Sequence, residues 1–515
     1  MTTLRQNEKE NEAAVCLAAL ARAEDWSTEE GVRLETPTFA ERFPYQMIDG
    51  EWVKSVSAAM LRVTSPATGE DVARIPAGDE RDAARAVKAA ARAFPAWAAT
   101  PLQERIRLVE TFMDLMAREE DDIVHWESAE LGTPLAYTRQ KHCRYQLSRI
   151  PAYIDSVRQL DFESRRRRAA VLIEPVGVVA AVTPWNFPLG QIFQKVVPAL
   201  LMGNTVVLKP SSLAPLTAVI MADCMVRAGF PKGVFNLING SGRVYEKVLT
   251  AHPDVALVSF TGSTEVGRRL SVLSAAHFKR VSLELGGKSP FIWLKGGADD
   301  ERAARTLMKS AFLNAGQTCT ALTRVLIPED DAPRLKALFT RIHAEFKVGA
   351  PDDPASVLGP VISRTQYESI RARIEEGLAE GATLWAGKVP GAAGSHGWYI
   401  EPVILGDVKN SMKVAREEIF GPVLSVITYR SVEEAVKLAN DSRYGLSSCI
   451  YGPETQANAL ARRIDAGNVF INDSPRDITA PFGGFKESGI GYESGREGLM
   501  TFARIKSVFD GRSAL

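Results

Sequence analysis

Cys319 and Glu284 are the residues whose types and settings best suit covalent chemistry. Cys319 ends the segment LNAGQTC (313–319) and Glu284 lies in LELGGK (283–288), so each belongs to its own glycine-containing turn. A thiolate can form a bond to an electrophilic carbon, and a carboxylate can activate the water that later breaks that bond. The structural alternatives are an unreactive buried thiol and a surface carboxylate at a strand end. The polar surroundings of Cys319 favour a reactive thiol, and the pair predicts nucleophilic catalysis followed by hydrolysis.

Two segments that follow predicted strands carry polar side chains suited to binding. In TPWNFP (183–188), the Asn186 amide can donate a hydrogen bond to a developing oxyanion. Standing alone, that segment is also typical of an ordinary strand-ending turn. In LKPS (208–211), Lys209 can hydrogen-bond the hydroxyls of a ribose, and an exposed loop lysine is an equal alternative.

Two further segments suit a nucleotide. FTGSTEVG (260–267) joins a predicted strand to a predicted helix, where a pyrophosphate can lie near helix N-terminal amides. It is neither GxGxxG nor a P-loop, so by itself it is weak evidence. In EEIFGP (417–422), Glu418 can hold a second ribose and Phe420 can pack on a nicotinamide, although the segment alone also resembles a helix end.

These segments lie in a regular alternation of apolar strands and helices. Strands are predicted at 176–182, 205–208, 234–237, 255–260 and 281–284, with helices at about 189–201, 216–228, 242–250 and 264–276. The alternation predicts a doubly wound parallel sheet that binds nucleotides at the carboxyl ends of its strands. A second block from about 289 to 470 has predicted helices at 303–315 and 334–346 and strands at 423–429 and 469–472. An earlier helix is predicted from about 79 to 94, ended by Pro95.

Composition indicates a soluble globular protein of two or three structural units. The chain has 515 residues, 62 Lys plus Arg and 62 Asp plus Glu, and this balance argues against a nucleic-acid or membrane-surface partner. No apolar run reaches the roughly 18 residues of a membrane span. The five cysteines are scattered and form no CxxC pair, which argues against a disulfide framework or a zinc site and makes a reducing cytoplasm the expected compartment. The basic run 164–168 is more typical of a solvated strand or hairpin face than of an anion site.

Taken together and in this order, the segments resemble the aldehyde dehydrogenase family. LELGGKS, GQTC, PWNFP, LKPS, FTGSTEVG, EEIFGP and PFGGFKESG (481–489) are similar to family motifs, and the resemblance spans about residues 45–508. It implies an α/β fold with a Rossmann-like cofactor domain, an α/β catalytic domain and a small β oligomerisation arm. The implied divisions are an N-terminal extension whose role the sequence does not indicate (1–44), the cofactor domain (45–152 and 175–287), the catalytic domain (288–487) and the arm (153–174 and 488–515).

The resemblance implies a role for each matching residue. Cys319 would attack the aldehyde to give a thiohemiacetal, whose oxyanion the Asn186 side chain and the Cys319 backbone N–H would stabilise. Hydride transfer to NAD or NADP would leave a thioester, and Glu284 would activate the water that hydrolyses it. The implied cofactor-binding residues are Trp185, Lys209, Ser212, Gly242, Gly262, Ser263, Glu418 and Phe420.

One departure from the family pattern concerns the choice of cofactor. NAD-specific members often carry a glutamate three residues after the lysine, and this chain has Ser212 there. A carboxylate would repel a 2′-phosphate and a serine would not, so we expect NADP to be accepted beside NAD.

The substrate tunnel is implied only in outline. Its expected lining is Phe187, Gln194, Leu313, Thr318, Thr320, Arg476 and Phe482. Gln194 replaces the arginine of succinic-semialdehyde enzymes, which disfavours that substrate, and the aromatic box for quaternary ammonium aldehydes is incomplete. Arg476 is expected either to meet a carboxylate at the tunnel mouth or, with more weight, to form a surface salt bridge. A medium-sized aliphatic or aromatic aldehyde is the default.

Two other activities compete with hydrolytic oxidation. A CoA-acylating semialdehyde dehydrogenase would pass the thioester to CoA, but such enzymes typically lack the glutamate that Glu284 provides. A catalytically silent structural member of the fold would typically lack the cysteine. The arm would expose strand edges unless another subunit covers them, so a homodimer or homotetramer is expected.

Overall fold

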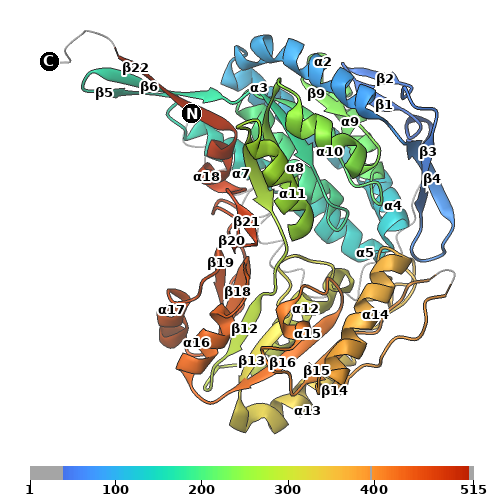
Figure 1. Cartoon of the computed structure of the whole chain (residues 1–515), viewed down its shortest axis with the longest axis vertical. Coiled ribbons are helices and arrows are strands. Elements are labelled where there is room, and N and C mark those ends of the chain that lie inside the picture. Colours follow the sequence, from blue (N-terminus) through green and yellow to red (C-terminus); the bar gives the residue numbers. More distant parts are fainter. Residues whose placement is uncertain (1–38, 395–396, 510–515) are drawn as a thin grey trace, which may run out of the picture.

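The larger of two main sheets has eight strands in the order β2-β1-β9-β8-β7-β10-β11-β21 (Figure 1). The computed structural model describes residues 39–394 and 397–509. The strands are β1 (Gln46–Ile48), β2 (Glu51–Val53), β7 (Val178–Val182), β8 (Thr205–Lys209), β9 (Phe235–Leu237), β10 (Val255–Thr261), β11 (Arg280–Glu284) and β21 (Gly489–Ile490). The strands from β9 to β11 are mutually parallel, while β1 and β21 add antiparallel edges.

Both faces of this sheet are covered by helices. Val179 and Ala181 of β7 belong to the apolar cluster that contains α8 (Pro188–Leu201) and α9 (Leu216–Arg227). Val178 and Ala180 belong to the opposite cluster, with α2 (Glu80–Ala98) and α10 (Gly242–Ala251). Successive side chains of a strand point to opposite faces, so β7 is apolar on both sides, as a doubly wound sheet requires. Helix α11 (Thr264–Ala275) follows β10, and the predicted α/β alternation is confirmed.

Three predicted helices end at other residues than expected, and one of them, 334–346, ends at His343 of α13 (Ala332–His343). Helix α2 continues past Pro95 to Ala98, because the proline lies in the last turn and Ala99 N still donates to the Pro95 carbonyl. The predicted helix 303–315 stops earlier, since α12 spans Asp300–Phe312. Asn314 and Ala315 have φ values of 57° and 52°, a left-handed conformation that an α-helix cannot contain.

A second, seven-stranded sheet forms the lower part of the molecule in Figure 1, in the order β14-β15-β16-β13-β12-β18-β19. Its strands are β12 (Pro290–Trp293), β13 (Arg324–Pro328), β14 (Thr383–Ala386), β15 (Val403–Gly406), β16 (Val423–Tyr429), β18 (Ser447–Tyr451) and β19 (Asn468–Ile471). All neighbours are parallel except β14 and β15. The accompanying helices are α12, α13 (Ala332–His343), α14 (Arg364–Ala379), α15 (Lys413–Arg416), α16 (Val432–Asn440) and α17 (Glu454–Ala461).

Smaller elements complete the fold. A hairpin joins β3 (Met60–Thr64) and β4 (Asp71–Pro76), and β17 (Tyr444–Gly445) pairs with β20 (Phe485–Lys486). Further helices are α3 (Leu102–Arg118), α4 (Glu120–Leu131), α5 (Leu135–Tyr137), a π-helical segment (Thr138–Arg144), α6 (Tyr145–Leu147), α7 (Ile150–Arg158) and α18 (Gly495–Thr501). Short 3-10 turns lie at Ala40–Arg42, Leu313–Gly316 and Glu329–Asp331.

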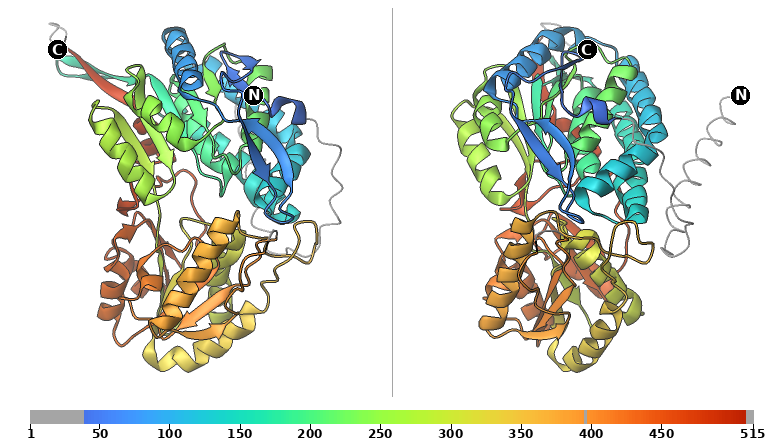
Figure 2. Two further views of the ribbon diagram at one scale, coloured as in Figure 1. Left: turned by 45° about the vertical axis from the view of Figure 1, so that its right-hand side comes forward. Right: turned by 90° about the vertical axis from the view of Figure 1, so that its right-hand side faces the viewer.

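A three-stranded sheet projects from the body of the molecule, as Figures 1 and 2 show. It consists of β5 (Glu163–Arg166), β6 (Ala169–Pro175) and β22 (Ala503–Phe509), with β6 in the centre. Residues 165–168 of the basic run are exposed at its hairpin, which confirms the solvated hairpin face predicted for that run. Of the predicted N-terminal extension, residues 1–38 lie outside the described part of the chain.

Some features are absent from the part of the chain that the structure describes. Across 39–394 and 397–509, no helix combines the length and apolar character needed to cross a membrane. The same residues contain no group of three or more His, Cys, Asp and Glu side chains placed to hold a metal ion. Cys143, Cys224, Cys319 and Cys449 are free thiols.

Candidate active site

Cys319 follows a tight left-handed turn at the end of α12. Asn314, Ala315 and Gly316 all have positive φ, with 69° at Gly316. A Cβ atom at Gly316 would lie 2.3 Å from the carbonyl of Gly421, so only glycine fits there. Positive φ at two residues other than glycine is strain of the kind that accumulates at functional sites. The local backbone therefore turns sharply just before the thiol.

Hydrogen bonds join this turn to the segment that contains Asn186. The Asn314 side chain donates to the Asn186 carbonyl (2.8 Å), and the Asn186 side chain donates to the Gln317 carbonyl (2.9 Å). Gln317 in turn accepts from Ile362 N and donates to the Asn314 carbonyl. An amide nitrogen carries two N–H groups, and the bond to Gln317 uses one of them. The Asn186 amide is thus held beside the cysteine turn with one donor left for a ligand.

A cavity of about 380 Å³ opens beside Cys319. That volume lies within the usual range of small-molecule sites. Six of the seven residues predicted for the substrate tunnel line it, namely Phe187, Gln194, Thr318, Thr320, Arg476 and Phe482. Leu313 is not among its lining residues and instead packs with the apolar cluster around Phe312. Phe470 and Cys449, which the sequence did not indicate, add to its wall.

The half-buried Cys319 thiol is strongly disfavoured as a thiolate in this structure. Burial raises the pKa of Cys319 to about 12, and the nearby carboxylates of Glu418, Glu284 and Glu493 add to the effect. The positive charge of Arg476 acts in the opposite direction. A nucleophilic role therefore requires additional positive charge, or fewer negative charges, when substrate and cofactor are bound.

Glu284, at the end of β11, has an unusual carboxyl group. The side chain is 3% exposed, and neither carboxylate oxygen accepts a hydrogen bond from the residues that the structure describes. Burial raises the pKa of Glu284 well above its ordinary value, and the charge of Glu493 raises it further, while Lys195 and Arg476 lower it. A buried carboxyl group without protein partners is suited to handling the proton of a water molecule.

Two charged residues near Glu284 were missed by the sequence analysis. Lys195 on α8 donates to Glu493 at 2.6 Å, and both side chains are buried. The only signal in the sequence was a lysine inside the apolar run of α8, where a buried lysine needs a partner. Nothing in the sequence indicated that Glu493 supplies it.

The residues predicted for the cofactor end lie on three separate elements. Lys209 ends β8, donates to the Pro210 carbonyl (2.7 Å), and has its pKa lowered by burial to about 8. Glu418 accepts from Gly287 N (3.1 Å), and burial raises its pKa to about 7. The rings of Trp185 and Phe420 meet edge to face at 5.4 Å.

The turn after β10 contains Gly262 and Ser263 and is tied to the neighbouring strand. Gly262 N donates to the Glu284 carbonyl (3.0 Å), which ties this turn to the end of the neighbouring strand. Ser263 caps α11, its hydroxyl accepting from Val266 N (3.4 Å). Gly242 begins α10 with open space where a Cβ atom would be. Ser212 lies half-buried in the turn after β8.

A second arginine, Arg149, lines the Cys319 cavity and was also missed. It is 5% exposed and donates to the Gln146 side chain (3.2 Å) and to the Ser494 hydroxyl (3.2 Å). Arg476 donates to the same hydroxyl (3.4 Å) and lies over the Phe482 ring. Within the described residues Arg476 forms no ion pair with a carboxylate, so the prediction that it forms a surface salt bridge is wrong.

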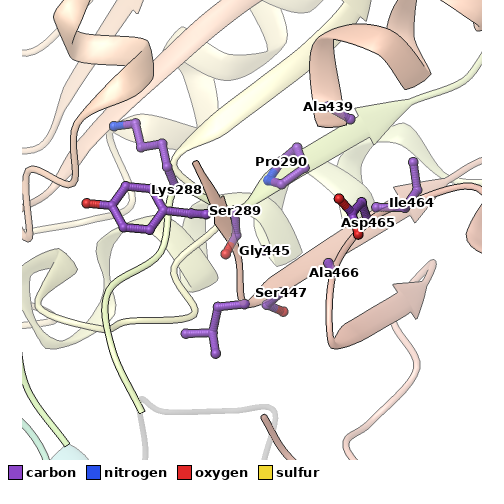
Figure 3. Close-up of a pocket in the computed structure, with 11 residues that line it drawn as sticks. Lys288, Ser289, Pro290, Ala439, Gly445, Ser447, Ile464, Asp465 and Ala466 are labelled. Carbon is purple, nitrogen blue, oxygen red and sulfur yellow. The ribbon is translucent and has the colours of Figure 1, made fainter. Parts of the chain in front are cut away.

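Figure 3 shows a different and smaller pocket between β12 and β18, with Lys288 pointing away from Asp465 across it. Burial lowers the pKa of Lys288 to about 7, and its ammonium group has no hydrogen-bond partner in the described structure. The two pockets have only Ser447 in common, so this pocket is separate from the cavity beside Cys319.

Comparison with known proteins identifies the group to which this architecture belongs. The profile of the aldehyde dehydrogenase family matches residues 52–508. A Staphylococcus saprophyticus protein assigned to the aldehyde dehydrogenases is 40% identical over 472 residues, covering 90% of this chain and 98% of that protein.

Solved structures agree with this assignment. Aldehyde dehydrogenase C of Pseudomonas syringae, a cysteine-to-alanine variant solved with NAD+ and octanal, is 37% identical with a TM-score of 0.89, covering 93% of this chain and 98% of that one. An NADP-dependent enzyme of Escherichia coli is 33% identical with a TM-score of 0.88, covering 93% of this chain and 100% of that one. The chain belongs to the aldehyde dehydrogenase family.

Proposed function

We propose that this protein oxidises an aldehyde to a carboxylic acid with NAD+ or NADP+, through a thioester on Cys319 that water hydrolyses. The observation that carries the proposal is the arrangement of three groups at or near the cavity beside Cys319. The Cys319 thiol lines it, the Asn186 amide is fixed to the same turn, and the unpartnered Glu284 carboxyl lies close enough to shift the pKa of the thiol.

The first half of the proposed reaction takes place on Cys319. The thiol loses its proton, and the sulfur adds to the aldehyde carbon, so that the C=O π electrons become an alkoxide of a thiohemiacetal. The free N–H of Asn186 and the Cys319 backbone N–H would donate to this oxyanion. The alkoxide electrons then re-form the C=O double bond as hydride leaves the carbon for the acceptor that bound NAD(P)+ would supply, which gives a thioester.

The second half needs Glu284 as a base. Its carboxylate takes a proton from water as the water oxygen adds to the thioester carbon, and the C–S bond breaks to release the acid and the cysteine. The carboxyl must be ionised for this step, so its raised pKa makes hydrolysis faster as pH rises. Because Glu284 and Glu418 both have raised pKa values, their protonated forms also reduce the negative charge facing the thiol.

The residues predicted for the cofactor end fit a nicotinamide dinucleotide. Lys209 offers a buried donor for ribose hydroxyls, Glu418 an acceptor, and Trp185 and Phe420 an aromatic wall. Gly242 begins α10 with open space where a Cβ atom would be, and Ser263 caps α11, so two helix N-termini could face a pyrophosphate and an adenosine. When bound, NAD(P)+ supplies the hydride acceptor and a positive charge near the thiol.

Ser212 supports acceptance of both cofactors. No carboxylate stands at this position to repel a 2′-phosphate. The Pseudomonas syringae relative was solved with NAD+, and the Escherichia coli relative is NADP-dependent, so the same fold serves either dinucleotide.

An assay of NAD(P)H formation from a simple aldehyde, with and without CoA, tests the proposal. We expect formation without CoA, no acceleration by CoA, and loss of activity in Cys319→Ala. If the product is an acyl-CoA and no free acid is formed, the protein is instead a CoA-acylating enzyme. Full activity in Cys319→Ala would contradict the mechanism.

We further propose the molecular organisation that the family resemblance implies. Residues 45–152 and 175–287 would form the cofactor domain, 288–487 the catalytic domain, and 153–174 with 488–515 an oligomerisation arm. The pairing of β6 with β22 supports joining these last two segments. A cytoplasmic homodimer or homotetramer is the corresponding assembly.

A further inference from the structure

Two guanidinium groups converge on the wall of the Cys319 cavity. Arg149 Nη2 lies 3.2 Å and Arg476 Nη2 lies 3.4 Å from the same oxygen, the hydroxyl of Ser494. Arg149 is 5% exposed, so most of its side chain is removed from water. Two like charges held on one hydroxyl repel each other, and burial weakens the solvent screening that normally reduces this cost.

Among the described residues no carboxylate forms an ion pair with Arg149 or Arg476, although the charge of Glu493 acts to raise the pKa of Arg476. The acidic groups nearby are already engaged, since Glu493 binds Lys195 and Asp473 forms an ion pair with Arg302. Asp477 accepts from the backbone and hydroxyl of Thr479. Buried charges in proteins are usually paired, so an unpaired pair of guanidinium groups facing a cavity is the signature of an anion-binding site.

The rest of the cavity wall suits an aliphatic chain. Phe187, Leu322, Phe470 and Phe482 line it together with the two arginines. Arg476 is close enough to the reacting groups for its charge to lower the pKa of both Cys319 and Glu284. The cavity therefore offers a thiol, an apolar wall and a cationic subsite to a single small molecule.

We propose that the preferred substrate is an aldehyde with a carboxylate at its far end, a semialdehyde of a dicarboxylic acid, whose carboxylate binds Arg149 and Arg476. The planar guanidinium fork matches the two oxygens of a carboxylate. This inference rests on the proposed aldehyde oxidation and adds the substrate class to it. This substrate class differs from the expectation drawn from Gln194, which disfavoured succinic semialdehyde. The difference arises because Arg149 and Arg476, which line the cavity, occupy other positions in the sequence than Gln194.

The test compares two substrates of similar shape, one with a charged carboxylate and one with a neutral ester. The ratio of kcat/KM for an ω-carboxy aldehyde to that for its methyl ester would be measured in the wild-type protein, over a series of chain lengths. A charged hydrogen bond contributes about 1.5–3 kcal/mol, so we expect the wild-type ratio to exceed about tenfold at the best chain length. The ratio should fall as ionic strength rises. A wild-type preference for the ester at every length would overturn the proposal.

Variants of the two arginines test whether they cause the preference for the ω-carboxy aldehyde. Arg476→Gln should lower the ratio by about 10- to 100-fold, and Arg149→Gln should lower it similarly. Arg149→Lys keeps the charge and should retain more of the preference, which guards against loss of folding as the explanation. Arg158→Gln, at the exposed end of α7, removes a positive charge outside the cavity and should leave the ratio unchanged. An unaltered ratio in Arg476→Gln would also overturn the proposal.

A binding measurement separates this inference from the proposed function. Alkylation of Cys319 by a small thiol reagent, followed by mass spectrometry, needs no turnover. A dicarboxylate should slow the alkylation more than its dimethyl ester does, and Arg476→Gln should remove this protection. Protection without oxidation of any aldehyde would refute the proposed function and keep the anion subsite. Oxidation of neutral aldehydes without Arg476-dependent protection would refute the subsite and keep the function.

Discussion

The surroundings of Glu284 shift the pKa of its carboxyl group, and this should affect the rate of the proposed hydrolysis. Its carboxyl is buried and unpartnered, next to Glu493 and within range of Lys195 and Arg476. The negative and positive neighbours act in opposite directions on its pKa, and burial has the largest effect. A base with a raised pKa becomes ionised at a higher pH than an ordinary glutamate, so the hydrolysis step should be sensitive to pH.

We therefore expect Glu284→Gln to form the thioester and then stall. Stopped-flow absorbance should show a burst of NAD(P)H near one equivalent per active site, followed by a steady rate at least about 100-fold slower, in line with the contribution of a general base. In the wild type, the hydrolysis rate should increase with pH through an apparent pKa well above that of an ordinary glutamate. Unchanged steady turnover in the variant would show that another group is the base.

Ser212 is expected to decide the cofactor preference. Ser212→Glu would place a carboxylate where a 2′-phosphate binds, so kcat/KM with NADP+ should fall at least about tenfold while NAD+ is affected much less. Initial rates with each cofactor measure this, and Ser212→Gln is the uncharged control of the same size. Equal losses with both cofactors would mean that Ser212 does not face the ribose.

At the scale of elements, the turn between α12 and Cys319 depends on Gly316. Its positive φ and the 2.3 Å approach to Gly421 leave no room for a methyl group. Gly316→Ala should lower the free energy of unfolding by about 1–3 kcal/mol or more, and it should reduce turnover by displacing the thiol. Gly391→Ala is the matched control, because a Cβ atom there meets nothing within 4 Å. Thermal unfolding that shifts equally in both variants would contradict this account.

The parallel strands could be predicted because they depend on local patterns, and the motifs that resemble the family pointed to six of the residues that line the cavity. Apolar runs marked β7, β8 and β10, and turn residues marked where each ends. Boundaries that depend on exceptions were missed, such as the proline tolerated in the last turn of α2 and the left-handed residues after Phe312. Leu313 was misplaced for the same reason, since the tight turn directs it to the core instead of the cavity.

Contacts between distant parts of the chain could not be predicted. Lys195 and Glu493 are 298 residues apart, and Arg149 meets Ser494 across 345 residues. No periodicity or motif encodes such a contact, because it is decided by how α7, α8 and the segment before α18 pack. The charges around Glu284 and the proposed anion subsite both depend on such long-range contacts.

At the scale of the whole molecule, the projecting sheet is the most conspicuous surface. Strand β22 is an edge strand that carries the exposed apolar side chains Ile505 (65%), Val508 (42%) and Phe509 (80%). An exposed apolar edge strand is a template for pairing with another chain. Its position away from the body in Figure 1 leaves room for such pairing.

Breaking this surface should therefore change the assembly. Ile505→Asp combined with Val508→Asp should shift the molar mass from an oligomer toward the 56.2 kDa chain, as measured by light scattering after gel filtration. Val272→Asp, at an exposed apolar site on α11, is the control and should leave the mass unchanged. A monomeric wild-type protein would refute the proposed assembly.

In the proposed reaction Cys319 carries the acyl group between oxidation and hydrolysis. Glu284→Gln incubated with aldehyde and NAD(P)+, quenched in acid and digested, should yield the Cys319 peptide with the mass of one acyl group, which hydroxylamine removes as expected for a thioester. An acyl group found on a different residue, or on none while NAD(P)H is formed, would contradict the account.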